Sequence, residues 1–139
     1  MKKIVAILLI LVLSINILLT VSSYTSIFGY NSIKVVSGSM IPSIKLNSVI
    51  VIKKSNYKVG DIITFKKDNV LITHRIKEID GNNVTTMGDS NNTADSSIKL
   101  NQIKGKVVFV IDNIYIIRIS LLILCVIYCL IERKDTNEE

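Results

Sequence analysis

Three short polar segments of the 139-residue chain hold the side chains that could do chemistry on a substrate. They are a serine among small residues, a lone histidine and two aspartates in one polar loop: Ser37–Pro42, His74, and Asp89 with Asp95. Small residues beside Ser39 let backbone N–H groups approach a ligand closely, as an oxyanion hole requires. A serine hydroxyl attacks a carbonyl only when a base takes its proton, and an imidazole suits that task near neutral pH.

Each segment also has a purely structural interpretation. A lone histidine between apolar strand residues, as His74 is, more often packs than catalyses. Ser37–Pro42 also has the composition of a turn, and the two aspartates could orient the histidine, bind a cation or form solvated Asx turns. The chain offers one histidine, and its two cysteines lie in a C-terminal apolar run, so no metal site is expected. Residue type and spacing alone leave the structural and catalytic interpretations open.

The segments that must position these residues lie between two apolar ends. Ile4–Val21 carries no charge, and at about 1.5 Å per residue its 18 residues reach roughly 27 Å, close to the hydrocarbon thickness of a bilayer. The exit from this run lacks a good small-x-small site, so an uncleaved anchor is favoured over a signal peptide. We predict an N-terminal transmembrane anchor over residues 1–22, with Lys2 and Lys3 holding its start in the cytoplasm.

The C-terminal run is a weaker candidate for a span. Its uncharged part, Ile119–Ile131, is short, and extension back to residue 113 includes an arginine. Basic residues follow it, which is typical of a return to the cytoplasm. We predict a second transmembrane helix over residues 113–132 and a cytoplasmic tail over 133–139, which makes the chain a multi-pass membrane protein. The alternative is one span plus an amphipathic helix lying on the membrane.

The region between these ends predicts a β domain. Short runs rich in β-branched residues alternate with Gly, Asn and Asp clusters, and no convincing helical period separates them. The runs are Ile33–Val36, Val49–Ile52, Asp61–Phe65, Val70–Ile79, Val84–Met87 and Lys106–Ile111. We therefore predict a mainly β fold, in which a small antiparallel domain over residues 23–112 lies outside the cytoplasm between the two transmembrane helices.

Size and charge exclude two classes of function. The middle region is too short for a two-lobed cofactor-binding fold, and no cofactor is expected. The chain has 17 basic and 11 acidic residues, a net charge of +6, but its lysines are scattered and only 6% of its residues are aromatic. Nucleic-acid binding is therefore not expected. A basic domain held against an anionic membrane surface explains the excess charge more simply.

The order of the polar motifs resembles that of type I signal peptidases, in the endoplasmic-reticulum-type branch of eukaryotic signal peptidase complexes, archaea and some Gram-positive bacteria. The motifs are Ser37-Gly38-Ser39-Met40-x-Pro42, His74-Arg75-Ile76, Gly88-Asp89-x-Asn91-Asn92…Asp95 and Gly105–Ile111. The branch depends on His74, because the other bacterial branch has a lysine there as general base. The chain departs from the pattern at Ser90, where the family has Asn, and at Asp112, near which a proline is common.

The resemblance implies a membrane-bound serine endopeptidase that removes N-terminal signal peptides from secreted precursors during translocation. Ser39 would be the nucleophile and His74 the general base. Asp95 would hold the imidazole, with Asp89 as the second candidate for that role. The Ser39 N–H and the Ser37 hydroxyl would form the oxyanion hole.

The rest of the resemblance concerns substrate and partners. As the resemblance implies, Ser37, Met40 and Pro42 would form the substrate-binding side of the serine motif. Signal peptides, membrane lipid and the translocon would be the partners. Two alternatives remain: a non-catalytic membrane-tethered β domain that serves assembly or adhesion, and a different membrane-bound serine hydrolase.

Overall fold

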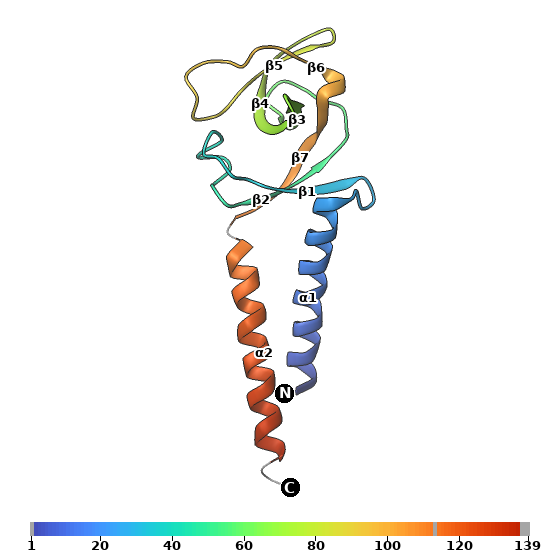
Figure 1. The fold of residues 1–139 in the computed structure, drawn as a ribbon, viewed down its shortest axis with the longest axis vertical. Helices are drawn as coiled ribbons and strands as arrows, with labels where there is room; N and C mark the ends of the chain where they lie inside the picture. The colour runs from blue at the N-terminus through green and yellow to red at the C-terminus, as the bar shows by residue number, and fades with distance from the viewer. Residues whose placement is uncertain (1, 113, 137–139) are drawn as a thin grey trace.

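The computed structural model describes residues 2–112 and 114–136, and in it a β domain stands on two long helices (Figure 1). Helix α1 spans Lys2–Tyr24 and helix α2 spans Ile114–Thr136. The helices contact each other and run from the β domain toward the same end of the molecule. The ends of the two helices that lie away from the β domain are therefore far from the polar motifs.

Seven antiparallel strands form one sheet with the order β1-β2-β7-β3-β4-β5-β6. The strands are β1 (Tyr30–Lys34), β2 (Val49–Lys53), β3 (Ile62–Lys67), β4 (Val70–Asp80), β5 (Asn83–Met87), β6 (Ile98–Lys99) and β7 (Ile103–Ile111). A 3-10 turn over Leu100–Gln102 joins the last two. The predicted fold class is confirmed, since the model is mainly antiparallel β with an apolar N-terminal helix and a helix at the C-terminal side. The short strand β6 was not predicted.

The first half of β4 and the outer side of β1 are strand edges without a hydrogen-bonded neighbouring strand among the described residues, and both line the same groove. Strand β4 pairs with β3 through Val70–Arg75 and with β5 through Arg75–Asp80, so its first half is paired on one side only. Strand β1 pairs with β2 alone in the described part of the chain. Unpaired edges of this kind can accept an additional extended chain.

Two apolar clusters hold the domain together and fix the two halves of the polar site. One lies among β3, β4, β5, β6 and β7 and is centred on Phe65, which is fully buried. The other joins β2 to the segment after β1 through Met40, Ile44, Ile50 and Ile52. The serine motif therefore rests on one cluster, and the histidine strand rests on the other.

Only α1, among the helices of the described residues, is long and apolar enough over Lys3–Tyr24 to cross a membrane. The apolar part of α2 is shorter, Ile119–Ile131, so the second predicted span stays a prediction. The top of α1 is fixed to β1, because the Ser32 hydroxyl donates to the Leu19 carbonyl at 2.6 Å and accepts from the buried Ser22 hydroxyl at 2.8 Å.

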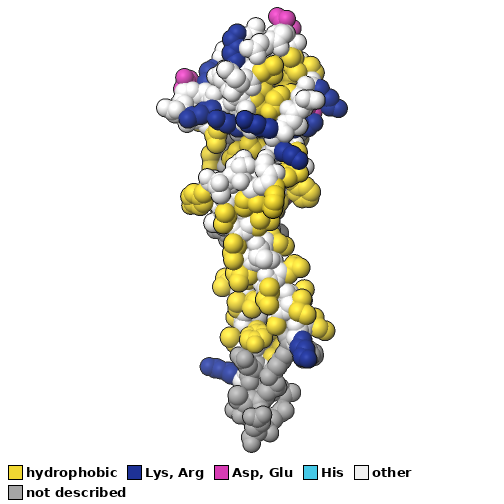
Figure 2. Space-filling model, turned by 90° about the vertical axis from the view of Figure 1, so that its right-hand side faces the viewer, with side chains coloured by type: hydrophobic (Ala, Val, Ile, Leu, Met, Phe, Trp, Pro, Cys, Tyr) yellow, Lys and Arg dark blue, Asp and Glu magenta, His cyan; other side chains and the backbone are white. Residues whose placement is uncertain are grey.

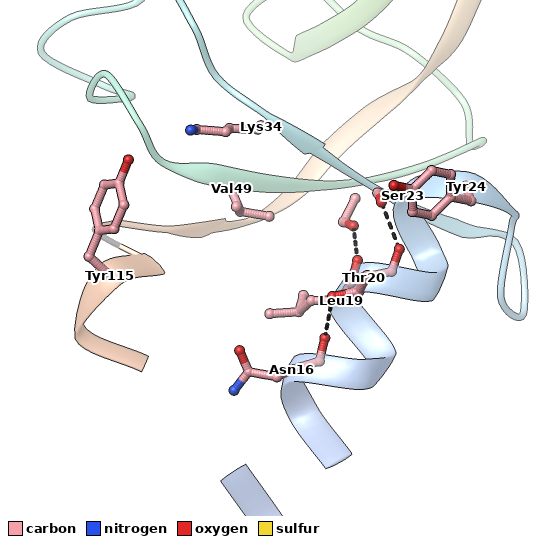
Figure 3. A pocket seen from close by; sticks show the side chains of 9 residues that line it. Asn16, Leu19, Thr20, Ser23, Tyr24, Lys34, Val49 and Tyr115 are labelled. Atoms are coloured by element: carbon pink, nitrogen blue, oxygen red, sulfur yellow. Dashed lines mark hydrogen bonds between the residues drawn. The ribbon is translucent and has the colours of Figure 1, made fainter. Parts of the chain in front are cut away.

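A hollow of about 220 Å³ lies where the two helices meet the sheet. Figure 3 shows Asn16 and Leu19 reaching from α1 toward this space, with Tyr115 of α2 on its opposite side. The Lys34 ammonium lies 5.8 Å from the centre of the Tyr115 ring. Polar side chains thus line the junction between stem and β domain.

Candidate active site

A hydrogen-bonded chain joins Ser39, His74 and Asp95, which lie far apart in the sequence. The Ser39 hydroxyl lies 3.1 Å from Nε2 of His74, and Nδ1 of the same ring lies 2.5 Å from Oδ2 of Asp95. The imidazole is buried, with 8% of its side chain exposed, and the edge of the Phe65 ring packs near it. Three of the residues singled out in the sequence are thus brought together in the order serine, imidazole, carboxylate.

The partners of the ring determine which nitrogen carries the proton when the imidazole is neutral. An ionised carboxylate can only accept a hydrogen bond, so Nδ1 donates to Asp95. The lone pair of Nε2 then faces the Ser39 hydroxyl, which donates to it. This is the arrangement in which an imidazole can take a proton from a serine.

A tight turn after β1 presents Ser39. The Ile44 N–H donates to the Met40 carbonyl at 2.9 Å, and the Ile41 N–H donates to the Gly38 carbonyl at 3.0 Å. Met40 is 2% exposed and Ile44 is fully buried, so the apolar face of the turn is packed into the core. Ser39 stands on the other side of this anchored turn, partly exposed beside His74.

The loop after β5 approaches the serine turn without space for a side chain. A Cβ atom at Gly88 would lie 2.7 Å from the Ser39 carbonyl oxygen, which is closer than real Cβ contacts come. Ser90, the departure from the family pattern, also bonds to this turn: its N–H donates to the Ser39 carbonyl at 3.0 Å and its hydroxyl to the Gly38 carbonyl at 2.8 Å. Glycine at 88 and serine at 90 therefore hold the loop against the serine turn.

Asp95 is itself held by strand β5. Its N–H donates to the Thr86 carbonyl at 2.8 Å, and the Thr86 hydroxyl donates to Oδ2 of Asp95 at 2.6 Å. Thr86 is fully buried. Its hydroxyl and Nδ1 of His74 therefore converge on the same carboxylate oxygen, which fixes the carboxylate against the ring.

Asp89, the second candidate, pairs with Arg75 and has no hydrogen bond with His74. The guanidinium donates from Nε to Oδ1 at 2.8 Å and from Nη2 to Oδ2 at 2.7 Å. These hydrogen bonds lower the pKa of Asp89 below its ordinary value and outweigh the opposing effect of burial. Arg75 also donates to the Gly60 carbonyl and to the Ser43 hydroxyl, so it joins the aspartate loop to the serine turn.

Two donors lie where an oxyanion would form. The Ser37 hydroxyl is exposed and lies 3.3 Å from the Ser39 hydroxyl oxygen. The Ser39 N–H has no hydrogen-bond acceptor in the described part of the chain, which leaves it available to a ligand. Pro42, which follows a cis peptide bond, is exposed and does not line the groove beside these residues.

A groove of about 370 Å³ leads to Ser39 and His74, which both line it. One wall is the end of β1 with the segment that follows it, from Ile33 to Ser37, and the other is the open edge of β4 from Val70 to His74. Met40, although buried, contributes to its floor. The groove is therefore lined by two unpaired backbone edges and by mostly apolar side chains.

No protein-family model matches the chain. Signal peptidase I W of Bacillus subtilis (strain 168) is 39% identical to it over 100 residues, which are 64% of this chain and 53% of that protein. The predicted resemblance to type I signal peptidases is confirmed. The chain spans about half the length of the signal peptidase that it matches.

Sequence reasoning missed two residues of this signal-peptidase-like site. Thr86 lies in a segment whose sequence predicts only a strand. Nothing in its spacing indicates that its hydroxyl donates a hydrogen bond to the Asp95 carboxylate. Arg75 follows the histidine in its motif, but its pairing with Asp89 depends on the strand register that brings β4 beside β5. The only available signal was the position of Arg75 directly after His74.

Proposed function

We propose that the chain is a membrane-anchored serine endopeptidase that removes signal peptides from secreted precursors. The observation that carries the proposal is the hydrogen-bonded chain from Ser39 through His74 to Asp95. The similarity to signal peptidase I W supports the same conclusion. A catalytic role is favoured over a purely structural one because the serine on Nε2 is partly exposed and lines an open groove together with the ring.

In the proposed reaction, the Ser39 hydroxyl oxygen attacks the carbonyl carbon of the scissile bond while its proton passes to Nε2 of His74. Asp95 accepts the hydrogen bond from Nδ1 and stabilises the imidazolium that forms. The Ser39 N–H and the Ser37 hydroxyl stabilise the oxyanion, and each such donor contributes about 3 kcal/mol to the transition state. The imidazolium then protonates the leaving amine, and water releases the signal peptide from the acyl-enzyme by the same steps.

The groove fits an extended substrate. A peptide lying between the open edges of β1 and β4 would form backbone hydrogen bonds on both sides, which is β-strand addition. Side chains of an extended segment alternate, so every second one would point to the apolar floor formed around Met40 and Ile44. This arrangement supports a peptide bond in an extended chain, rather than a compact small molecule, as the substrate.

The anchor suits a substrate that is itself held in the membrane. Hydrogen bonds join the top of α1 to β1, and β1 leads directly into the serine turn, so the site lies near the end of the predicted span. Confinement of enzyme and precursor to one membrane plane raises their effective concentration. In this proposal the β domain lies outside the cytoplasm, α2 forms a second span, and the translocon delivers the precursors.

The test is cleavage of a model preprotein by the purified full-length chain in neutral detergent. Ser39→Ala removes only the nucleophile, and Ser55→Ala, which changes an exposed serine away from the groove, is the matched control. The proposal requires loss of cleavage in the first variant and full cleavage in the second. Equal cleavage by both variants would contradict it and favour the assembly or adhesion alternative.

A further inference from the structure

Three lysines surround a second hollow on the β domain, apart from the catalytic residues. The hollow has a volume of about 490 Å³, and Lys54, Lys66 and Lys104 line it. An adjoining depression of about 440 Å³ shares Lys66 and Lys104, and Asp68 lines that depression as well. The neutral polar groups of the hollow come from Ser23, Asn31, Ser32 and Asn69, and no carboxylate lines it.

Some other cations of the domain are neutralised by carboxylates, whereas these three lysines are not in the part of the chain that the structure describes. Arg75, Lys45 and Lys106 each form an ion pair with an aspartate, Asp89, Asp112 and Asp61 respectively. None of the three lysines of the hollow has an ion pair within the described residues. Like charges that share a depression repel one another, so an anion bound there would lower the free energy of this surface.

The hollow lies on the membrane-proximal side of the β domain. Ser23, which lines it, belongs to the last turn of α1, the helix suited to span a membrane. Just beyond that turn, Tyr24 and Phe28 are 88% and 93% exposed, as aromatic residues at a membrane interface are. Figure 2 shows basic side chains in a band across the lower part of the β domain, above the apolar side chains of the stem.

We propose that Lys54, Lys66 and Lys104 form a binding site for the phosphate of an anionic phospholipid headgroup. The site would hold the β domain down on the outer leaflet beside α1. It would thereby fix the height of the groove above the membrane, because Ile33 and Leu71 line both the hollow and the groove. The proposal depends on the membrane position of α1 and not on catalysis.

The experiment measures thermal unfolding of the full-length chain in neutral detergent micelles as phosphatidylglycerol is added. Parallel titrations use phosphatidylcholine, inorganic phosphate and an acidic peptide. The test variant is Lys54→Gln/Lys66→Gln/Lys104→Gln. The control, Lys58→Gln/Lys77→Gln/Lys99→Gln, removes the same charge from residues that do not line the hollow.

Phosphatidylglycerol should raise the melting temperature of the wild type and of the control, and phosphatidylcholine should not. A lysine beside an anionic headgroup contributes about 5-fold in affinity, so the test variant should bind on the order of 100-fold more weakly. A triple arginine variant at the same positions should fold and keep the effect, which separates loss of charge from loss of folding.

Three results would overturn the proposal. The first is an equal response of the test and control variants to phosphatidylglycerol. The second is a full response to inorganic phosphate alone, which would indicate a general anion site. The third is tighter binding of the acidic peptide than of the lipid, which would assign the lysines to a protein partner.

Discussion

Replacing Asp95 with asparagine gives a result that depends on Thr86. In the wild type, the Thr86 hydroxyl and Nδ1 of His74 both donate to Oδ2 of Asp95. An asparagine amide has one accepting oxygen and one donating nitrogen. Because Thr86 is fully buried and its hydroxyl has no other acceptor in the described residues, the amide oxygen should take the place of Oδ2. The ring would then keep its proton on Nδ1.

The expected magnitudes follow from the bonds that change. Asp95→Asn keeps both hydrogen bonds but loses their charge assistance, worth about 2 kcal/mol, so kcat/KM should fall roughly 30-fold. Thr86→Val removes one hydrogen bond but leaves the accepting carboxylate, and should cost about 10-fold. In the double variant nothing prevents the amide nitrogen from facing Nδ1. The proton would then move to Nε2, a change of tautomer that costs about 10⁴-fold in other serine proteases.

The assay is cleavage of a model preprotein by the four proteins, the wild type, both single variants and the double variant, at equal folded concentration. The product of the two single effects is a loss of about 300-fold in kcat/KM. The double variant should lose about 10⁴-fold, which is about 30-fold more than this product. Thr86→Ser should behave as the wild type, because it keeps the hydroxyl. A 10⁴-fold loss for Asp95→Asn alone, or a double variant equal to the product of the singles, would refute the reasoning.

Three further predictions concern the loop and the base. Asp89→Asn weakens the pair with Arg75 and should lower the melting temperature by about 10 °C, for about 2 kcal/mol, with cleavage per folded molecule retained. The pKa of Asp89 in the folded protein lies below its ordinary 3.8. The difference in stability between the wild type and Asp89→Asn should therefore be full at neutral pH and be lost as the pH falls below 3.8. Unfolding of both proteins measured across this acid range checks it. Gly88→Ala should reduce cleavage at least about 10-fold, since its Cβ displaces the loop from the Ser39 carbonyl; wild-type rates would contradict this. His74→Lys should be inactive in the same assay, because lysine acts as a base only with a strongly lowered pKa.

The strands of the β domain were largely predictable, because each carries its own local signal. Four predicted runs, from Val49 to Met87, match β2, β3, β4 and β5 within two residues at each end. Strand β1 begins earlier than the run Ile33–Val36, because the polar Ser32 is buried against α1 rather than exposed. Strand β6 has only two residues and pairs through Asn83 and Val84, so it is too short for any alternation to show.

The sheet order and the contacts of the site were not predictable from local patterns. Strand β7 lies between β2 and β3, a pairing between distant parts of the chain that depends on the whole fold. The motifs indicated Ser39, His74 and the loop with two aspartates, but composition does not distinguish the two carboxylates. Their difference arises from neighbouring side chains: one meets the imidazole, and the other meets the guanidinium of Arg75.

The most direct measurement of the central claim uses the single histidine of the chain. In full-length protein purified without a histidine tag and labelled with ¹⁵N in the imidazole, only one ring contributes to the spectrum. With the ring neutral, the account predicts a proton on Nδ1, hydrogen-bonded to Asp95, and an unprotonated Nε2 facing Ser39. A neutral ring protonated on Nε2, or a spectrum unchanged by Asp95→Ala, would contradict the claim that His74 is held ready to take the serine proton.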